Sequence, residues 1–546
     1  MAEQPTSVTG RLGFWILIGL LFCLYVLTIS RVSSVDAYYY FNDLEKGDLY
    51  ELCHPHHLAY ELVGKAWFEG WRMLGYGGRS AWPLKLMSLF GSVGALVLFG
   101  KTLQLLFPRG YVAFGLLLVL GLSYLPWHYA TEGEPVAFFL FFACLNIYFL
   151  VRLNGKDKVG VHDAARVGFA SGLGVLFHQA LVFALPIALV ILWRRSAPTS
   201  RLRVTMVFIV IAGIVVVVPY LVAALLIFGG ETPQKFLLWS TGYLDEFAGG
   251  YGRSHNFVPT VILRGFATAF LGGTALKTYL YGQAPKDMGF VKALFPFLVL
   301  FGALGGGLVA LLFRWRRWGV TTRRTLAIML IFTAVFTVAT IYWEPSNRKF
   351  WAPTMPGLIL LAGAGWFIVR NGNRPMGRVR YGLDAGLSGL VLLLLLGNLF
   401  GGILHKHQMR DEQQELSLKL QKIYQSGDLV VMQGDRLWQS LDYHFQDIHS
   451  IGIIAYSNPE WVAADTTLHY AARAMRMVLM KGHTGYVSSG VSDEFLAFLH
   501  EAMADTGEQL VQSHLFSFAD SEQLDLVYDL YDLKLARIQP EANSIE

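Results

Sequence analysis

The chain has 546 residues and a net charge of +5, and 54% of its residues are hydrophobic while only 15% are charged. A composition this apolar, with a mean hydropathy of +0.44, excludes an ordinary soluble domain. Repeated apolar runs of about 18 to 25 residues can each cross a hydrocarbon core of about 30 Å as a helix, so we expect a polytopic α-helical membrane protein. The three cysteines are scattered, which argues against a disulfide framework or a thiolate metal site.

The first apolar run follows a single basic residue, Arg11, and has no small-residue cleavage site after it. We therefore interpret it as a retained transmembrane helix that also serves as a signal anchor. The remaining runs bring the predicted number of spanning helices to eleven. The predicted spans are residues 13–30, 82–106, 111–127, 135–153, 164–178, 179–194, 203–229, 290–313, 323–342, 351–370 and 382–404.

The loops between these spans alternate in charge. The segments "VRLNGKDK", "WRRSAPTSRLR", "FRWRRWGVTTRR" and "VRNGNRPMGRVR" are rich in Lys and Arg and fall on one side of the membrane. By the positive-inside rule this side is cytoplasmic, which places the N-terminus inside and the C-terminus outside. The external segments are then a first loop over residues 31–81, a loop over 230–289 and everything after about residue 405. The stretch 258–280 is either interfacial or re-entrant, and its Arg264 and Lys277 favour the interfacial arrangement.

The first external loop contains the densest group of titratable residues in the chain. Asp36 lies about six residues after the first helix, so we expect it near the membrane surface, where its carboxylate could act as a general base. Tyr39 and Asp48 follow in the same loop. The alternative is that the acidic residues only solvate an external loop.

The three histidines of this loop, His54, His56 and His57, invite a metal interpretation. Their spacing fits neither the i, i+4 pair of a helix nor a structural zinc pattern. A divalent metal ion shared by Asp36 with His54 or with Glu132 remains open, since carboxylate and imidazole ligands suit several metals.

Further polar residues lie at predicted external helix ends. Glu132 and Glu134 in "TEGEP" are candidates for an acceptor site or a second acidic site, although an acidic residue before Pro135 also favours a helix start. Arg348 and Lys349 in "SNRKF" run against the positive-inside trend, or they are ordinary interfacial cations. In the loop over 230–289, the aromatic and polar residues Trp239, Tyr243, Asp245, Tyr251 and Arg253 could form a saccharide-binding lip or simply cover a cavity.

The tail over residues 405–546 has 21 acidic residues against 10 basic ones. Short β-branched segments such as "DLVVMQG", "SIGIIAYS", "TGYVSS" and "QLVQSHLFSF" alternate with helical patterns, so we predict a small external C-terminal α/β domain. The tail contains no phosphate-binding Gly-rich loop and no Ser/His/Asp motif. We expect it to pack against other parts or to recognise an acceptor.

The order of these motifs resembles that of the GT-C superfamily. Asp36 after the first helix, Tyr39 three residues on, the "GD" that ends at Asp48 and the "HP" that begins at His54 look like the first external loop of these enzymes. The segments around "HYATEGEP", "GLGVLFHQALVF" and "EPSNRKFWAP" are similar to later landmarks of the family, and together they cover residues 10–370. The family comprises multispanning glycosyltransferases that use polyprenyl-phosphate sugars, such as lipid A aminoarabinose transferases and protein O-mannosyltransferases. One departure is that many members have two adjacent acidic residues where this chain has Asp36 and Ala37.

The resemblance implies an inverting glycosyltransferase domain over residues 1–404. Asp36 would be the catalytic base, and Arg348, Lys349 and His178 would bind the donor phosphate. His54 and His57 would shape the loop or line the donor pocket. The implied partners are a polyprenyl-phosphate sugar, the lipid bilayer, and a lipid, glycan or protein acceptor, with no nucleic acid.

Two other functions remain open. A transporter or flippase for a lipid-linked substrate would place ionisable residues near the middle of the membrane, whereas Asp36, Glu132, His178 and Arg348 lie at helix ends. A non-catalytic membrane scaffold would not depend on Asp36. We expect the protein to reside in a bacterial inner membrane with its active face in the periplasm.

Overall fold

The computed structural model describes most of the membrane part of the chain and the regular elements of the tail. The chain divides into two compact units, one comprising Met1–Val32 and Asp43–Met409 and the other Ser33–Asn42 and Arg410–Glu546. The described residues are 8–107, 110–228, 233–241, 257–272, 288–370, 377–408, 422–423, 425–433, 443, 449–453, 466–488, 493–504, 508–516 and 530–537.

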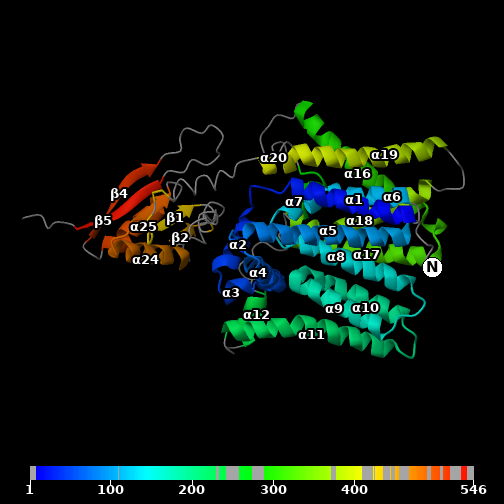
Figure 1. The fold of residues 1–546 in the computed structure, drawn as a ribbon, viewed down its shortest axis with the longest axis horizontal. Helices are drawn as coiled ribbons and strands as arrows, with labels where there is room; N and C mark the ends of the chain where they lie inside the picture. Colours follow the sequence, from blue (N-terminus) through cyan, green and yellow to red (C-terminus); the bar gives the residue numbers. More distant parts are fainter. Residues whose placement is uncertain are drawn as a thin grey trace, which may run out of the picture. The chain divides into compact units, whose positions relative to one another are not determined.

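Helices build the first unit, and its long helices run side by side (Figure 1). The first half contains α1 (Val8–Leu27), the end of α2 (Val35–Lys46), α3 (Leu49–Leu52), η1 (Pro55–His57), α4 (Leu58–Met73), α5 (Ala81–Leu106), α6 (Gly110–Leu122), α7 (Tyr124–Thr131), α8 (Val136–Gly155), α9 (Val161–Phe177), η2 (Gln179–Phe183), α10 (Ala184–Arg195) and α11 (Arg201–Phe228). The second half contains α12 (Pro233–Thr241), α14 (Pro259–Phe270), α16 (Met288–Phe313), η4 (Trp315–Arg317), α17 (Val320–Trp343), η5 (Arg348–Trp351), α18 (Thr354–Arg370), α19 (Gly377–Asn398), η6 (Leu399–Ile403) and α20 (Leu404–Gln408).

Within the described residues, six helices are long and apolar enough to cross a membrane. The bent pair α6 and α7, which meet at 54°, makes a seventh span if it is counted as one. The predicted spans 164–178 and 179–194 correspond to α9 and α10, which have 17 and 12 residues and are separated by η2. A multi-pass helical membrane protein is therefore confirmed, while the number of eleven spans stays a prediction.

Two glycines allow α16 and α18 to approach closely. A Cβ atom added to Gly365 would collide with the carbonyl group of Gly307, and one added to Gly307 would lie 2.5 Å from the carbonyl oxygen of Ala362. Lipid tails are as apolar as the helix surface, so close backbone packing through small residues is a main source of helix association in a membrane.

A buried asparagine joins three elements near the bend between α6 and α7. The Nδ2 group of Asn398 donates to the carbonyl oxygens of Leu122 and Phe270 at 2.7 and 2.8 Å. Its Oδ1 atom accepts from the backbone N–H of Gly272 at 2.9 Å. These bonds satisfy backbone groups that the ends of α6 and α14 would otherwise leave unpaired away from water.

The first loop folds into short helices that are held by ion pairs and caps. Glu45, near the end of α2, accepts hydrogen bonds from the Arg79 guanidinium at 2.7 Å and from the Ser80 backbone N–H at 2.7 Å. Asp48 is exposed and caps α3, because its carboxylate accepts from the backbone N–H groups of Tyr50 and Glu51. Glu45 and Asp48 therefore have structural partners within this loop.

A five-stranded mixed sheet forms the core of the second unit. Its strands follow the order β2-β1-β3-β5-β4, with β1 parallel to β2 and β3, and β5 antiparallel to β3 and β4. Side chains of β1 and β3, such as Val431 and Val487, pack with Met475 and Leu499 from the two helices. The elements are β1 (Leu429–Gln433), β2 (His449–Ile453), α24 (Thr466–Met480), β3 (Gly485–Ser488), α25 (Asp493–Ala504), β4 (Glu508–Phe516) and β5 (Leu530–Arg537).

Candidate active site

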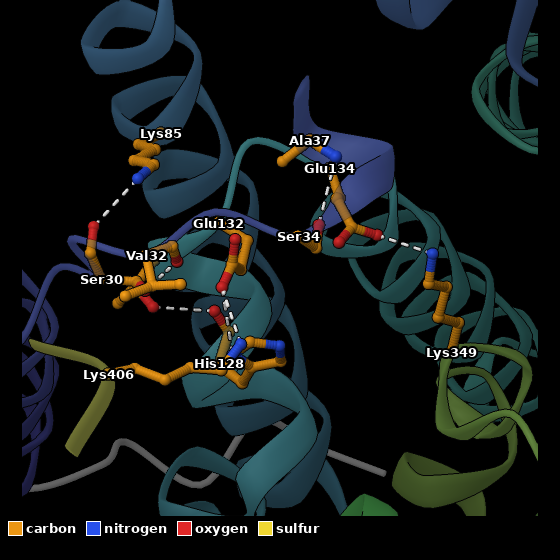
Figure 2. A network of polar contacts seen from close by, with 11 residues as sticks. Ser30, Val32, Ser34, Ala37, Lys85, His128, Glu132, Glu134, Lys349 and Lys406 are labelled. Atoms are coloured by element: carbon orange, nitrogen blue, oxygen red, sulfur yellow. Dashed lines mark hydrogen bonds and ion pairs between the residues drawn. The ribbon is translucent and has the colours of Figure 1, made fainter. Parts of the chain in front are cut away.

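Glu132 lies at the C-terminal end of α7 and is fully buried. Its Oε1 atom lies 3.2 Å from the Nζ atom of Lys406 in α20 and 3.6 Å from the Nδ1 atom of His128 (Figure 2). A buried carboxylate is costly unless it is paired, and here one cation comes from a helix 274 residues further along the chain. The pair therefore fixes the end of α7 against the last helix of the first unit.

Glu134 is also buried, with 1% of its surface exposed, and it forms an ion pair with Lys349 of η5. The two charged atoms are 2.9 Å apart (Figure 2). Burial lowers the pKa of Lys349 to about 8, so this amine is close to losing its proton at mildly alkaline pH. Glu134 also precedes the N-terminus of α8, where the helix dipole favours a negative charge.

Arg348 lies beside the same cluster. Its guanidinium carbon is 4.8 Å from the centre of the Tyr124 ring, a cation–π contact. The Tyr124 ring in turn stacks on His128, with 5.0 Å between the ring centres. The structure thus brings Glu132, Glu134, Arg348 and Lys349 into one network, which we call the α7–η5 charge cluster together with His128, Tyr124 and Lys406.

His178, a candidate phosphate ligand, lies between α9 and η2. Its ring stacks on Phe139 with 3.7 Å between the ring centres, and its Nδ1 atom accepts from the backbone N–H of Ala180 at 3.3 Å. The ring of Phe350, the residue after Lys349, contacts the His178 ring edge-on, with 6.4 Å between the ring centres. His178 therefore caps η2 and packs against aromatic rings close to η5.

The three histidines of the first loop pack together. The rings of His54 and His57 stack at 4.3 Å, and His56 contacts Trp343 edge-on at 6.0 Å. Burial lowers the pKa values of His56 and His57 to about 3 and that of His54 well below its ordinary value, so these rings are neutral at physiological pH. Among the described residues, no group of three or more His, Cys, Asp or Glu side chains is arranged to hold a metal ion.

Glu61 is a buried acid that the sequence pattern did not single out. Its Oε2 atom lies 2.9 Å from the Nδ1 atom of His57, one helical turn away. Burial raises the pKa of Glu61 well above its ordinary value. Burial favours the neutral form of both groups, and the hydrogen bond joins them inside the protein.

Asp36 and Tyr39 belong to the second unit, whereas the α7–η5 charge cluster belongs to the first. Asp36 lies in the first turn of α2 and is half-buried, as is Tyr39. The convergence of Asp36 with Glu132, His178 and Arg348 in one cavity therefore stays a prediction.

The loop over 230–289 is described in part. Trp239 of α12 is buried and packs against Tyr220 and Phe228 at 5.8 and 6.1 Å between ring centres. The remaining lip candidates lie outside the described residues: Tyr243, Asp245, Tyr251 and Arg253.

Lys406, His128 and Tyr124 are the members of the cluster that the sequence analysis missed. Lys406 carried the same signal as Arg348 and Lys349, a basic residue at a predicted external helix end. His128 lies four residues before Glu132 on the same helical face, a spacing that permits side-chain contact.

The fold and the cluster together define a polytopic helical membrane protein whose buried charges gather at the ends of helices, with a mixed α/β unit in its tail. No family model and no curated protein matches the chain. ArnT from Cupriavidus metallidurans bound to undecaprenyl phosphate matches it in structure with a TM-score of 0.56 and 12% identity. The same protein in the apo state matches with a TM-score of 0.55 and 11% identity, and each match covers 96% of this chain and 98% of the other. The resemblance to GT-C lipid A aminoarabinose transferases is thus confirmed at the level of the fold.

Proposed function

We propose that this protein is an inverting membrane glycosyltransferase that moves a sugar from a polyprenyl-phosphate donor to a hydroxyl group of an external acceptor. The observation that carries the proposal is the α7–η5 charge cluster, which sets Arg348, Lys349 and Lys406 at helix ends within an ArnT-like fold. The likeness to a protein bound to undecaprenyl phosphate supports a polyprenyl-phosphate ligand. The proposal includes eleven spans, a cytoplasmic N-terminus and an active face in the periplasm of a bacterial inner membrane.

In this mechanism Asp36 accepts the proton of the acceptor hydroxyl while the acceptor oxygen attacks the anomeric carbon. The bond from that carbon to the phosphate oxygen breaks, and its electron pair leaves with the phosphate. One direct displacement inverts the anomeric centre.

The cations act on the leaving group. The donor is a phosphodiester with one negative charge, and the departing lipid phosphate gains a second. Arg348 and Lys349 therefore interact more strongly with the transition state than with the bound donor, which is the condition for accelerating the reaction. Glu132 and Glu134 pair with the cationic side chains before the donor binds, and they would orient the acceptor.

The test is the transfer of labelled sugar from a panel of polyprenyl-phosphate donors to lipid, glycan and protein fractions. We expect the wild type to use at least one donor and Asp36→Asn to lose transfer by about two to four orders of magnitude, as for other general bases. Asp157→Asn, which changes an exposed acid of the predicted cytoplasmic loop, serves as the matched control and should remain active. An inert wild type, or a fully active Asp36→Asn, would refute the mechanism.

A further inference from the structure

A pocket of about 580 Å³ lies at the turn η4 between α16 and α17. Both of these helices contribute membrane spans, Leu294–Phe313 and Val320–Trp343. The turn that joins them therefore lies where hydrocarbon gives way to lipid headgroups. Basic and aromatic residues line one part of the pocket, and apolar residues line the other: Arg314, Trp315, Arg316 and Arg317, with Leu312, Phe313 and Leu330.

The three arginines of this pocket have no counter-ion among the described residues. The structure records no side-chain hydrogen bond or ion pair for Arg314, Arg316 or Arg317 within the ranges it describes. Some basic residues of the predicted cytoplasmic loops do form ion pairs within the protein. Arg370 binds Asp384 at 2.6 Å, and Lys156 binds Asp163 at 2.5 Å.

The apolar wall of the pocket is not covered by other described parts of the protein. Phe313 is 88% exposed, Leu312 is 69% exposed and Leu330 is 51% exposed. Trp315 has the amphipathic side chain that is enriched at membrane interfaces. A ligand that satisfies both walls needs an anionic group at headgroup level and hydrocarbon chains that continue along the helices.

We propose that this pocket binds an anionic phospholipid through its phosphodiester headgroup. Guanidinium groups match phosphate oxygens in geometry and remain charged at any physiological pH, and basic pockets between spanning helices are suited to anionic headgroups. The positive-inside rule accounts for basic residues in this loop, but it does not require three of them to line one cavity with an apolar wall. A soluble anion would contact the arginines alone, whereas a phospholipid also contacts the wall of Leu312, Phe313 and Leu330.

The test measures lipid retention by native mass spectrometry in nanodiscs that contain equal amounts of phosphatidylglycerol and phosphatidylcholine. We expect the wild-type protein to retain phosphatidylglycerol preferentially. The triple variant Arg314→Gln/Arg316→Gln/Arg317→Gln should reduce that preference about tenfold or more, because each of the lost contacts is charge-assisted. The matched control Lys158→Gln/Arg166→Gln/Arg203→Gln removes three exposed charges of the same predicted face, one from a loop and two from near the starts of α9 and α11, and should keep the preference.

Three results would overturn the proposal. They are equal retention by the wild type and the pocket variant, equal loss in the pocket variant and the control, and a thermal stabilisation by inorganic phosphate alone that matches that by phosphatidylglycerol. If the glutamine variant does not fold, the Arg→Lys triple variant replaces it. That variant keeps the charge but loses the bidentate geometry, so it should retain phosphatidylglycerol more weakly than the wild type, and unchanged retention would contradict the proposal.

Discussion

Single residues in the first unit show how burial controls charge. Lys349 and Glu134 meet at 2.9 Å with most of both side chains removed from water. His57 and Glu61 meet at the same distance, but there burial favours the neutral form of both groups. The same separation therefore joins an ion pair of Lys349 and Glu134 in one place and two groups whose neutral forms are favoured in the other.

The lowered pKa of Lys349, about 8, gives the proposed transfer reaction an alkaline limit. Above that pH the amine becomes neutral and no longer stabilises the leaving phosphate, so transfer should fall by about tenfold per pH unit once deprotonation dominates. Lys349→Arg should move this limit upward, because a guanidinium stays charged. The measurement is the transfer rate between pH 6 and 10 for both proteins. Lys65→Arg, at a lysine that binds the carbonyl of Leu44, is the control and should leave the limit in place.

The neutral histidines predict sensitivity of the fold to acid. The folded-state pKa of His56, about 3, lies below its ordinary value of 6.5, so between these values the unfolded chain binds a proton that the folded protein does not. Stability should therefore be complete above about pH 6.5 and should fall as the pH decreases, by up to about 1.4 kcal/mol per pH unit for this group.

The comparison is thermal unfolding in detergent at pH 7, 6 and 5 for the wild type, His56→Gln and His162→Gln. We expect His56→Gln to lose less stability on acidification than the wild type. His162 is exposed on α9, so His162→Gln should follow the wild type. Parallel curves for all three proteins would contradict the assignment of a neutral, buried His56.

At the scale of elements, close contacts between helices position the cluster. The turn η5 that carries Arg348 and Lys349 lies between α17 and α18, and α18 packs along α16. Gly307 and Gly365 permit this approach because a larger residue at either position would meet the opposing backbone.

Two neighbouring glycines of α16 provide a matched test of that contact. Gly307→Ala should destabilise the protein by about 1–3 kcal/mol, because the new methyl group meets the backbone of α18 and the helices must separate. Gly306→Ala adds the same methyl group where no atom lies within 4 Å, so it should be neutral or slightly stabilising. Thermal unfolding of both variants in detergent measures the difference, and a similar effect of the two substitutions would argue against tight packing at Gly307.

At the scale of the whole molecule, topology decides which loops can share chemistry. The positive-inside rule places the loop around Lys158 in the cytoplasm and the turn around Ser346 outside. Lys349 and Lys406 lie at helix ends that the sequence assigns to the outer face. Each forms an ion pair with an acid from the same predicted face, Lys349 with Glu134 and Lys406 with Glu132.

Cysteine labelling tests this topology directly. In a background without native cysteines, Ser346→Cys should react with a membrane-impermeant maleimide on intact spheroplasts. Lys158→Cys should react only after the membrane is permeabilised. Both residues are exposed, so folding does not hide either site. Labelling of both positions from the same side would exclude the proposed arrangement.

The sequence predicted most of the charged residues of the α7–η5 charge cluster, but not which of them pair with each other. Glu132, Glu134, Arg348 and Lys349 were predicted because charges beside long apolar runs are costly and conspicuous. The pairing of Glu132 with Lys406 could not be predicted, because contacts between residues 274 apart depend on how the helices pack. In the tail, β1 to β4 lie on the four predicted strand segments, whereas β5 was missed although its charged residues Asp532 and Lys534 alternate with apolar ones, a pattern typical of a half-buried strand.

The ion pair between Glu134 and Lys349 has a consequence for turnover. Under the proposed function, a donor phosphate that binds Lys349 competes with the Glu134 carboxylate, which lies 2.9 Å from the amine, so donor binding would exchange one anion for another. The affinity for lipid phosphate would then be a difference between two pairings. After the proposed transfer, the return of Glu134 to Lys349 would help to expel the lipid phosphate, so the protein's own carboxylate would speed product release.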